Sequence, residues 1–159
     1  MSENVRAVLV GCGGMSRRWT AVSKDHPNLD IVGFVDIIED AAKTRAADYG
    51  DGDYVIGTDL AETLKDLKPD VVFDCTIPEA HTPNALIAFE HGCHVLSEKP
   101  MSDSMANARS ALEAAQKAGL TYAMIQNRRY DPNIRRLRRF LDANHIGPLT
   151  TVNCDFYKG

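Results

Sequence analysis

The sequence predicts a doubly wound α/β domain, in which a mostly parallel β-sheet lies between two layers of helices. Three observations support this prediction: short apolar runs rich in β-branched residues alternate with helical stretches, their connections are short, and the composition is that of a globular domain. The 159 residues are 44% hydrophobic and 25% charged. These values exclude disordered, collagen-like and coiled-coil chains, and the length suits one domain with a real core.

Six runs are predicted to be strands, because each is short, apolar and followed by a polar residue or a glycine. The run 71–73 (Val-Val-Phe) is apolar at every position, as expected for a parallel strand that helices cover on both faces. The predicted strands are 5–10, 31–35, 54–56, 71–73, 94–96 and 121–125.

Capping residues mark two of the helices between these strands. Thr82 followed by Pro83 predicts a helix start with proline in the first helical position, and Gly92 predicts its end. Asp59 with Glu62 resembles a capping box at the start of another helix.

A further helix is predicted before the run 121–125, with Gly119 as its stop. Its predicted apolar face repeats at steps of three and four residues and consists of Met105, Ala108, Leu112 and Ala115. The single tryptophan, Trp19, is expected to pack a helix against the sheet.

The last part of the chain reads as a helix, a break and one more strand. The helix is predicted at 131–144, with its arginines on a solvated polar face, and 146–148 (Ile-Gly-Pro) breaks the chain. Residues 149–157 read as a strand that follows a complete α/β unit. We therefore expect one domain at 1–146 and the first strand of a truncated second domain at 147–159.

Charge, hydropathy and cysteine spacing restrict the partners. The formal net charge of −4 argues against a nucleic-acid binder, and no apolar run approaches the roughly 20 residues of a membrane span. The polar N-terminus has no signal-peptide pattern, so we expect a cytoplasmic protein. The cysteines lack the spacing of metal ligands, so we expect reduced thiols and no metal; they are Cys12, Cys75, Cys93 and Cys154.

A glycine-rich turn, residues 11–16 (Gly-Cys-Gly-Gly-Met-Ser), directly follows the first predicted strand and opens a helix. In a dinucleotide site, Gly11 would allow the tight turn and Gly13 would let the backbone approach a pyrophosphate, which the helix N-terminus attracts. Ser16 stands where such motifs have a third glycine.

Asp36 ends the second predicted strand, twenty residues after Ser16, where a carboxylate would bind the hydroxyl groups of the adenosine ribose. Ile37 and Ile38 follow it, so no cation is offered to a 2′-phosphate, and we expect NAD in preference to NADP. The alternative is a structural glycine turn followed by an aspartate that caps the next helix.

The tripeptide Glu98-Lys99-Pro100 follows the predicted strand 94–96, at the sheet edge where ligands of open α/β sheets bind. There Lys99 could donate a hydrogen bond or a proton to a substrate oxygen, with Glu98 tuning its pKa. The alternative is an ordinary exposed ion pair before a proline.

Together with the glycine turn, three segments give the chain a family resemblance: 75–81 (Cys-Thr-Ile-Pro-Glu-Ala-His), 90–100, which ends in Glu-Lys-Pro, and 127–130 (Asn-Arg-Arg-Tyr). With them the whole chain resembles the Gfo/Idh/MocA oxidoreductase family. The resemblance implies a Rossmann domain that binds the nucleotide, followed by a larger α+β domain that forms the substrate pocket and usually the oligomer interface.

The resemblance also implies roles for individual positions. Residues at the glycine turn and the second strand would hold the pyrophosphate and the adenosine ribose: Gly11, Gly13, Gly14, Met15, Ser16, Asp36 and Ile37. Others would line the cleft or lie at the nicotinamide end: Thr76, Pro78, His81, Glu98, Lys99 and Asn127. Lys99 would be catalytic and would contact substrate with Asn127 and Arg128, whereas Glu79 stands where the family often has asparagine.

The implied activity is NAD-dependent hydride transfer between NAD(H) and a secondary alcohol or carbonyl of a sugar, a polyol or a related small molecule. Family members usually carry a further Asp and His acid/base pair in the second domain, and none follows Gly159, so we expect this chain to be catalytically incomplete. The alternative is a non-catalytic NAD-binding sensor or interaction module. We expect a homo-oligomer for a full-length form and self-association through 149–157 here.

Overall fold

The computed structural model of the chain describes residues 4–155 and residue 157. These residues form two compact units, which are divided between Ile125 and Gln126. The predicted boundary at 146/147, which separates a cofactor domain from a substrate domain, stays a prediction. In the described part of the chain, no helix is long and apolar enough to cross a membrane.

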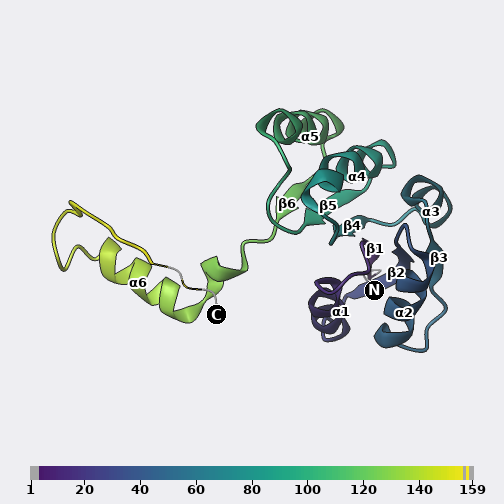
Figure 1. The fold of residues 1–159 in the computed structure, drawn as a ribbon, viewed down its shortest axis with the longest axis horizontal. Coiled ribbons are helices and arrows are strands. Elements are labelled where there is room, and N and C mark those ends of the chain that lie inside the picture. The colour runs from purple at the N-terminus through teal and green to yellow at the C-terminus, as the bar shows by residue number, and fades with distance from the viewer. Residues whose placement is uncertain (1–3, 156, 158–159) are drawn as a thin grey trace. The chain divides into compact units, whose positions relative to one another are not determined.

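The first unit is built on one parallel sheet, which confirms the predicted fold class (Figure 1). Within the described residues the sheet has six strands in the order β3-β2-β1-β4-β5-β6, and every neighbouring pair is parallel. The strands are β1 (Val5–Val10), β2 (Leu29–Val35), β3 (Val55–Gly57), β4 (Val71–Asp74), β5 (His94–Ser97) and β6 (Tyr122–Met124). The strand order reverses between β1 and β4, so the carboxyl ends of these two strands mark the switch point of the sheet.

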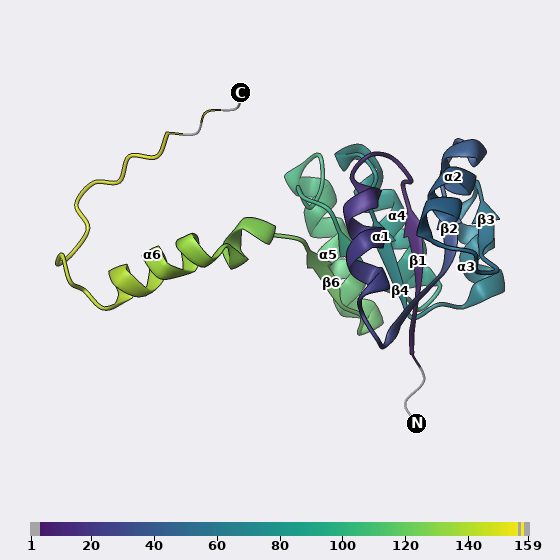
Figure 2. The same ribbon diagram turned by 90° about the horizontal axis from the view of Figure 1, so that it is seen from below.

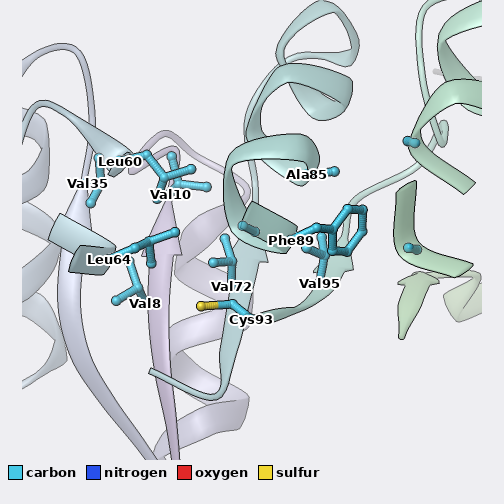
Figure 3. Close-up of a cluster of buried hydrophobic side chains, with 13 residues drawn as sticks. Val8, Val10, Val35, Leu60, Leu64, Val72, Ala85, Phe89, Cys93 and Val95 are labelled. Carbon is cyan, nitrogen blue, oxygen red and sulfur yellow. The ribbon is translucent and has the colours of Figure 1, made fainter. Parts of the chain in front are cut away.

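Helices cover both faces of this sheet (Figure 2). They are α1 (Ser16–Lys24), α2 (Glu39–Tyr49), α3 (Leu60–Leu67), α4 (Pro78–Glu90) and α5 (Met105–Ala118). Residues of α1 and α2 pack with Leu9 and Phe34 on one face. Residues of α3, α4 and α5, among them Phe89 of α4, pack with Val8 and Val72 on the other (Figure 3). The alternation of buried side chains along β1 therefore places one core on each side of the sheet.

Two predicted helix ends are confirmed. The side chain of Asp59 accepts a hydrogen bond from the backbone N–H of Glu62 (2.9 Å) and so caps α3. Gly119 ends α5 in the left-handed conformation that glycine adopts without strain.

The predicted start of α4 at Thr82-Pro83 is wrong. The helix begins at Pro78, and Pro83 lies inside it. Pro78 occupies the first helical position, where its missing N–H has no intrahelical partner to lose. His81 and Thr82 are buried, and the Thr82 hydroxyl bonds to that of Ser102 (2.8 Å) instead of capping a helix. Tertiary packing therefore outweighs the hydrogen bond that Pro83 cannot donate.

The predicted apolar face of α5 is also partly wrong. Met105 and Leu112 are exposed, whereas Ala111 and Ala115 are fully buried. Alanines four residues apart let a helix approach its neighbours closely, so the small residues of α5 form its packed face.

The second unit contains a 3₁₀ turn, η1 (Asn127–Tyr130), and α6 (Pro132–Asp142). Asp131 caps α6 by accepting from the N–H groups of Asn133 and Ile134. The strand predicted at 149–157 is not present: its described residues, 149–155 and 157, form no strand, and Phe156 lies outside the described residues. A strand is stabilised by hydrogen bonds to a neighbouring strand, and the described residues offer none to this segment.

The Asp59 cap gives a stability prediction. We expect Asp59→Ala to lower the free energy of unfolding by about 1 kcal/mol, because an N–H of the first turn of α3 loses its partner. Urea unfolding measures this difference. Asp66→Ala, at an exposed position of the same helix, serves as the matched control, with an expected change within about 0.5 kcal/mol. Equal losses for the two variants would contradict the capping role.

Candidate functional site

Gly11 makes the turn after β1 and is fixed by close packing. Its N–H donates to the carbonyl of Val35 (2.9 Å), and its φ of +86° is in the left-handed region. A Cβ at this position would lie 2.7 Å from the carbonyl carbon of Cys75 and from the nitrogen of Thr76. Glycine is therefore required here because the segment after β4 passes directly against the turn.

Gly13 and Gly14 have the opposite environment. Both are exposed, and a Cβ built on either would meet no atom within 4 Å. The helix α1 begins just beyond, at Ser16, with Met15 at its N-cap and no acidic residue in its first turn. The positive end of this helix therefore faces an open space beside glycine backbone, which suits an anion such as a pyrophosphate.

Asp36 lies beside this loop, at the end of β2. Its Oδ2 accepts a hydrogen bond from the N–H of Cys12 (2.7 Å), and its Oδ1 accepts from the N–H of Ile38 (2.9 Å). A carboxylate has about four lone-pair sites, so two remain for ligand hydroxyl groups. Ile37 and Ile38 are both exposed, and neither places a cation next to the carboxylate.

The end of β4 carries a polar cluster around the buried Asp74 that sequence reasoning missed. Asp74 is fully buried, and its Oδ1 accepts from both the N–H and the hydroxyl of Thr76. The side-chain amide of Asn84 on α4 donates to Asp74 Oδ2 (3.1 Å) and to Thr76 Oγ1 (3.2 Å). The hydroxyl of Thr76 is therefore held from two sides. The signal in the sequence was an aspartate directly after the apolar run 71–73.

His81 is fully buried and connects two loops of the same sheet edge. Its Nδ1 lies 2.7 Å from the carbonyl oxygen of Pro100, and its Nε2 lies 3.2 Å from the carbonyl oxygen of Thr76. Carbonyl oxygens only accept, so a neutral imidazole donates to one of them, and a protonated one donates to both. His81 therefore lies behind the loops after β4 and β5 and supports them, and Pro78 begins the helix that carries it.

Glu98 is oriented by Trp19, the tryptophan of α1. The indole Nε1–H donates to Glu98 Oε1 (2.9 Å), and Oε2 accepts from the N–H of Lys99 (3.2 Å). The ring of Trp19 also packs on Phe73 at 5.3 Å between centroids, so its predicted position between helix and sheet is confirmed. Among the described residues, no ion pair joins the side chains of Glu98 and Lys99. The ordinary ion pair considered as an alternative is therefore not formed.

Lys99 is exposed at the carboxyl edge of the sheet, and the bond between Lys99 and Pro100 is cis. Asn127 and Arg128 belong to η1 in the second unit, and their predicted contacts with nicotinamide or substrate stay predictions. The structure thus brings together the predicted residues of the first unit at the carboxyl ends of the strands.

The thiols of Cys12 and Cys75, in and beside the glycine turn, are unreactive as nucleophiles. Burial, followed by the neighbouring Asp36 carboxylate, raises the pKa of Cys12 to about 12. Burial likewise raises the pKa of Cys75 far above that of an ordinary thiol, and the carboxylate of Asp74 adds to the effect. Both thiols stay protonated at neutral pH, so neither is a nucleophile. Among the described residues, no group of three or more His, Cys, Asp or Glu side chains could hold a metal ion.

Comparison with known proteins agrees with this geometry. Residues 5–126 match the family model described as "Oxidoreductase family, NAD-binding Rossmann fold" (GFO_IDH_MocA). The 4-carboxy-2-hydroxymuconate-6-semialdehyde dehydrogenase of Sphingobium sp. is 30% identical over 142 residues, 89% of this chain and 44% of the relative. The D-glucoside 3-dehydrogenase of Escherichia coli is 28% identical over 149 residues, 93% of this chain and 42% of the relative.

Solved structures share the fold. GenD2 from gentamicin A biosynthesis, crystallised with NAD, has a TM-score of 0.81 at 28% identity, over 91% of this chain and 40% of its own. The WlbA dehydrogenase of Bordetella pertussis, crystallised with NADH and UDP-GlcNAcA, has a TM-score of 0.85 at 21% identity, over 92% of this chain and 42% of its own. The chain thus spans less than half the length of the proteins it matches.

The contrast between the glycines of the turn can be measured. We expect Gly11→Ala to lower the free energy of unfolding by roughly 2–6 kcal/mol, since a positive φ and an overlap with backbone atoms each cost about 1–3 kcal/mol. Gly13→Ala is the matched control, and its change is expected within about 0.5 kcal/mol because its Cβ meets open space. Urea unfolding of both variants would contradict this assignment if Gly13→Ala proved the more damaging.

Proposed function

The chain belongs to the Gfo/Idh/MocA oxidoreductase family, and from this premise we propose that residues 1–146 are the NAD-binding part of a dehydrogenase. The reaction is hydride transfer between NAD(H) and a secondary alcohol or carbonyl of a sugar, a polyol or a related small molecule. The observation that carries the proposal is the open glycine turn at the N-terminus of α1, with Asp36 tied to the same turn.

The residues of this edge fit a dinucleotide. Gly13 and Gly14 leave a space that any Cβ would fill, and N–H groups at the start of α1 suit the pyrophosphate of NAD. The free lone pairs of Asp36 accept the hydroxyl groups of the adenosine ribose, and the exposed side chain of Ile37 lies beside it. Bound NAD would supply the hydride chemistry, which no side chain of this edge can perform.

At the other end of the cofactor, Glu98 and Lys99 have different tasks. The indole of Trp19 holds the Glu98 carboxylate in one orientation, in which it can accept a hydroxyl group of the nicotinamide ribose. The exposed ammonium of Lys99 donates a hydrogen bond or a proton to the substrate oxygen as charge develops on it. Asn127 and Arg128 are proposed to contact substrate.

Thr76 is proposed to line the cofactor between these two ends, and His81 supports its loop from behind. The buried carboxylate of Asp74 fixes Thr76, and His81 joins the Thr76 loop to the loop that contains Lys99. Loops held in this way present their groups without rearrangement when the cofactor binds. Pro78, which is also proposed to line the cofactor, begins α4 two residues after Thr76.

The proteins that this chain matches support the substrate class. Relatives include a D-glucoside 3-dehydrogenase and a D-apiose dehydrogenase, both of which are named for sugars. Matched proteins are more than twice as long as the matched region, which supports a second domain, beginning at 147–159, for substrate and oligomer contacts. The second candidate is a non-catalytic NAD-binding module. Both candidates bind NADH, so a panel of keto sugars separates them only in a form that includes the proposed second domain: a dehydrogenase oxidises NADH there, and a binding module does not.

The proposed cofactor site is tested by Gly13→Val. At NAD⁺ concentrations a hundredfold above Kd, binding should add about 2.7 kcal/mol to the free energy of unfolding of the unmutated chain. We expect Gly13→Val to abolish this gain because its side chain fills the space for the pyrophosphate. Urea unfolding with and without NAD⁺ measures the gain, and a native far-UV spectrum serves as the control. A full gain in the variant would place the cofactor elsewhere.

The preference for NAD is expected to depend on the charge of Asp36. NADH should bind more tightly than NADPH, because the carboxylate repels a 2′-phosphate. Asp36→Asn removes the charge yet keeps an oxygen for the N–H of Cys12, so the two affinities should approach each other. NADH and NADPH fluorescence titrations measure the ratio, and Asp40→Asn, an exposed site nearby with the same charge change, should leave it unchanged. Equal affinities in the unmutated chain would contradict the prediction.

A further inference from the structure

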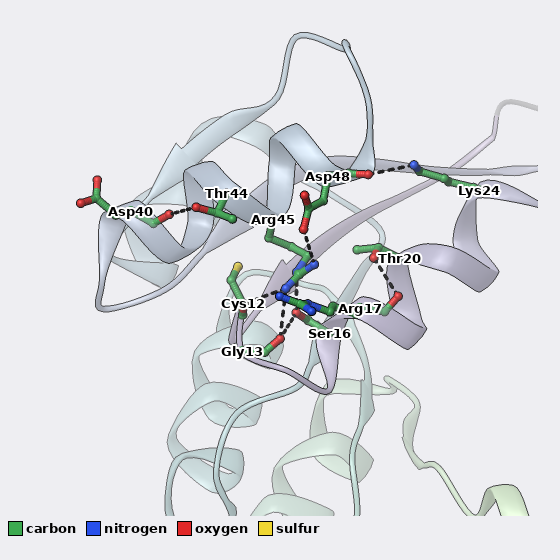
Figure 4. A network of polar contacts seen from close by, with 10 residues as sticks. All are labelled: Cys12, Gly13, Ser16, Arg17, Thr20, Lys24, Asp40, Thr44, Arg45 and Asp48. Carbon is green, nitrogen blue, oxygen red and sulfur yellow. Dashed lines mark hydrogen bonds and ion pairs between the residues drawn. The ribbon is translucent and has the colours of Figure 1, made fainter.

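Arg45 is a buried cation directly behind the glycine turn (Figure 4). It projects from α2 and is only 4% exposed. Its Nε–H donates to Ser16 Oγ (2.8 Å), and its Nη2 donates to the carbonyl oxygens of Cys12 and Gly13 (3.4 Å each). Its Nη1 forms an ion pair with Asp48 (3.0 Å), which is half exposed. One guanidinium thus binds three acceptors of the turn: the carbonyl oxygens of Cys12 and Gly13 and the hydroxyl of Ser16.

Because the peptide bond is planar, the hydrogen bonds of Arg45 to two carbonyl oxygens also set the direction of the following N–H groups. In a trans peptide the C=O and the following N–H point in opposite directions. The carbonyls of Cys12 and Gly13 face Arg45, so the N–H groups of Gly13 and Gly14 face the other way. A Cβ built on either of these glycines would meet nothing within 4 Å, so the turn is open around the two residues that carry these N–H groups.

Ser16 completes the arrangement at the position where glycine is usual in such turns. It is fully buried, and its hydroxyl donates to the carbonyl of Gly13 (2.6 Å) while it accepts from Arg45 Nε. With glycine at position 16, Nε–H of Arg45 would be buried without this partner, which is costly for a charged group. Ser16 and Arg45 are therefore chemically matched to each other.

We propose that Arg45 and Ser16 are a positioning pair, which holds the glycine turn with its N–H groups aimed at the cofactor pyrophosphate and places a permanent positive charge behind it. This inference rests on the proposed NAD site. The ion-pair partner of the guanidinium, Asp48, is half exposed, so solvent screens this carboxylate more than it screens the buried cation. The pair acts on ligands that carry a diphosphate and not on the nucleoside alone.

A purely structural role makes a different prediction. If Arg45 only ties α2 to the turn, its loss lowers the stability of the fold and weakens every ligand of the cleft to the same degree. The discriminating quantity is therefore the ratio of affinities for ligands with and without a diphosphate. NAD⁺ and ADP carry the diphosphate, whereas adenosine does not.

The experiment measures the dissociation constants of NAD⁺, ADP and adenosine for the 159-residue chain by isothermal titration calorimetry. We expect Arg45→Met to weaken NAD⁺ and ADP by about tenfold or more, the size expected when charge-assisted hydrogen bonds to an anion are misdirected, and adenosine by less than about threefold. Arg45→Lys should recover part of the loss, because it keeps the charge without the fork. Ser16→Ala should reduce diphosphate binding in the same direction, and it provides a milder variant where Arg45→Met folds poorly.

Arg6→Met is the matched control. Arg6 also donates from its guanidinium to backbone carbonyls, those of Leu67 (2.8 Å) and Lys68 (3.3 Å). It lies near the amino-terminal end of β1, at the other end of the strands from the glycine turn. Arg6→Met should lower stability and leave all three affinities unchanged. Equal losses for the three ligands, or no loss in Arg45→Met and Ser16→Ala, would overturn the positioning role. If the unmutated chain bound neither NAD⁺ nor ADP, the proposed function itself would fail and this inference with it.

Discussion

The close approach of two chain segments at the switch point of the sheet is the constraint on which the site depends. The turn after β1 packs so tightly against the start of the segment after β4 that Gly11 has no room for a side chain. This contact fixes where the turn lies, and therefore where α1 begins and where its positive end points. Gly13 in the same turn has the opposite environment, because a Cβ there would meet no atom within 4 Å. The turn is therefore packed against protein at Gly11 and has room for a ligand at Gly13.

Around this point, polar groups of neighbouring elements hold one another in place along a single sheet edge. Trp19 reaches from α1 to Glu98 after β5, and His81 reaches from α4 to the loops after β4 and β5. Arg45 does the same from α2, behind the turn. Each tie is buried or half-buried and its polar atoms are hydrogen-bonded, so the edge is preorganised for a dinucleotide instead of being assembled by it.

Much of this fold was predictable because parallel strands and side-chain caps leave local signals. The strands follow apolar runs, and Asp59 caps α3 from a position that the sequence marks. The errors share a different cause. The start of α4 and the packed face of α5 depend on which residues the tertiary fold buries. The local sequence around Pro83 and Leu112 carries no signal for this burial. Arg45 was missed because a cation in a polar helix reads as exposed, and only the tertiary fold shows the carbonyls that it faces.

The central claim is that the N–H groups of Gly13 and Gly14 donate hydrogen bonds to the pyrophosphate of NAD. Amide resonances report this directly, so the most direct measurement is a ¹H–¹⁵N correlation spectrum of the chain during titration with NAD⁺. The account predicts large, saturable shifts at Gly13, Gly14 and the indole of Trp19, with small shifts at the opposite sheet edge around Arg6. Saturable binding that shifts the opposite edge and leaves the glycine amides unmoved would contradict it.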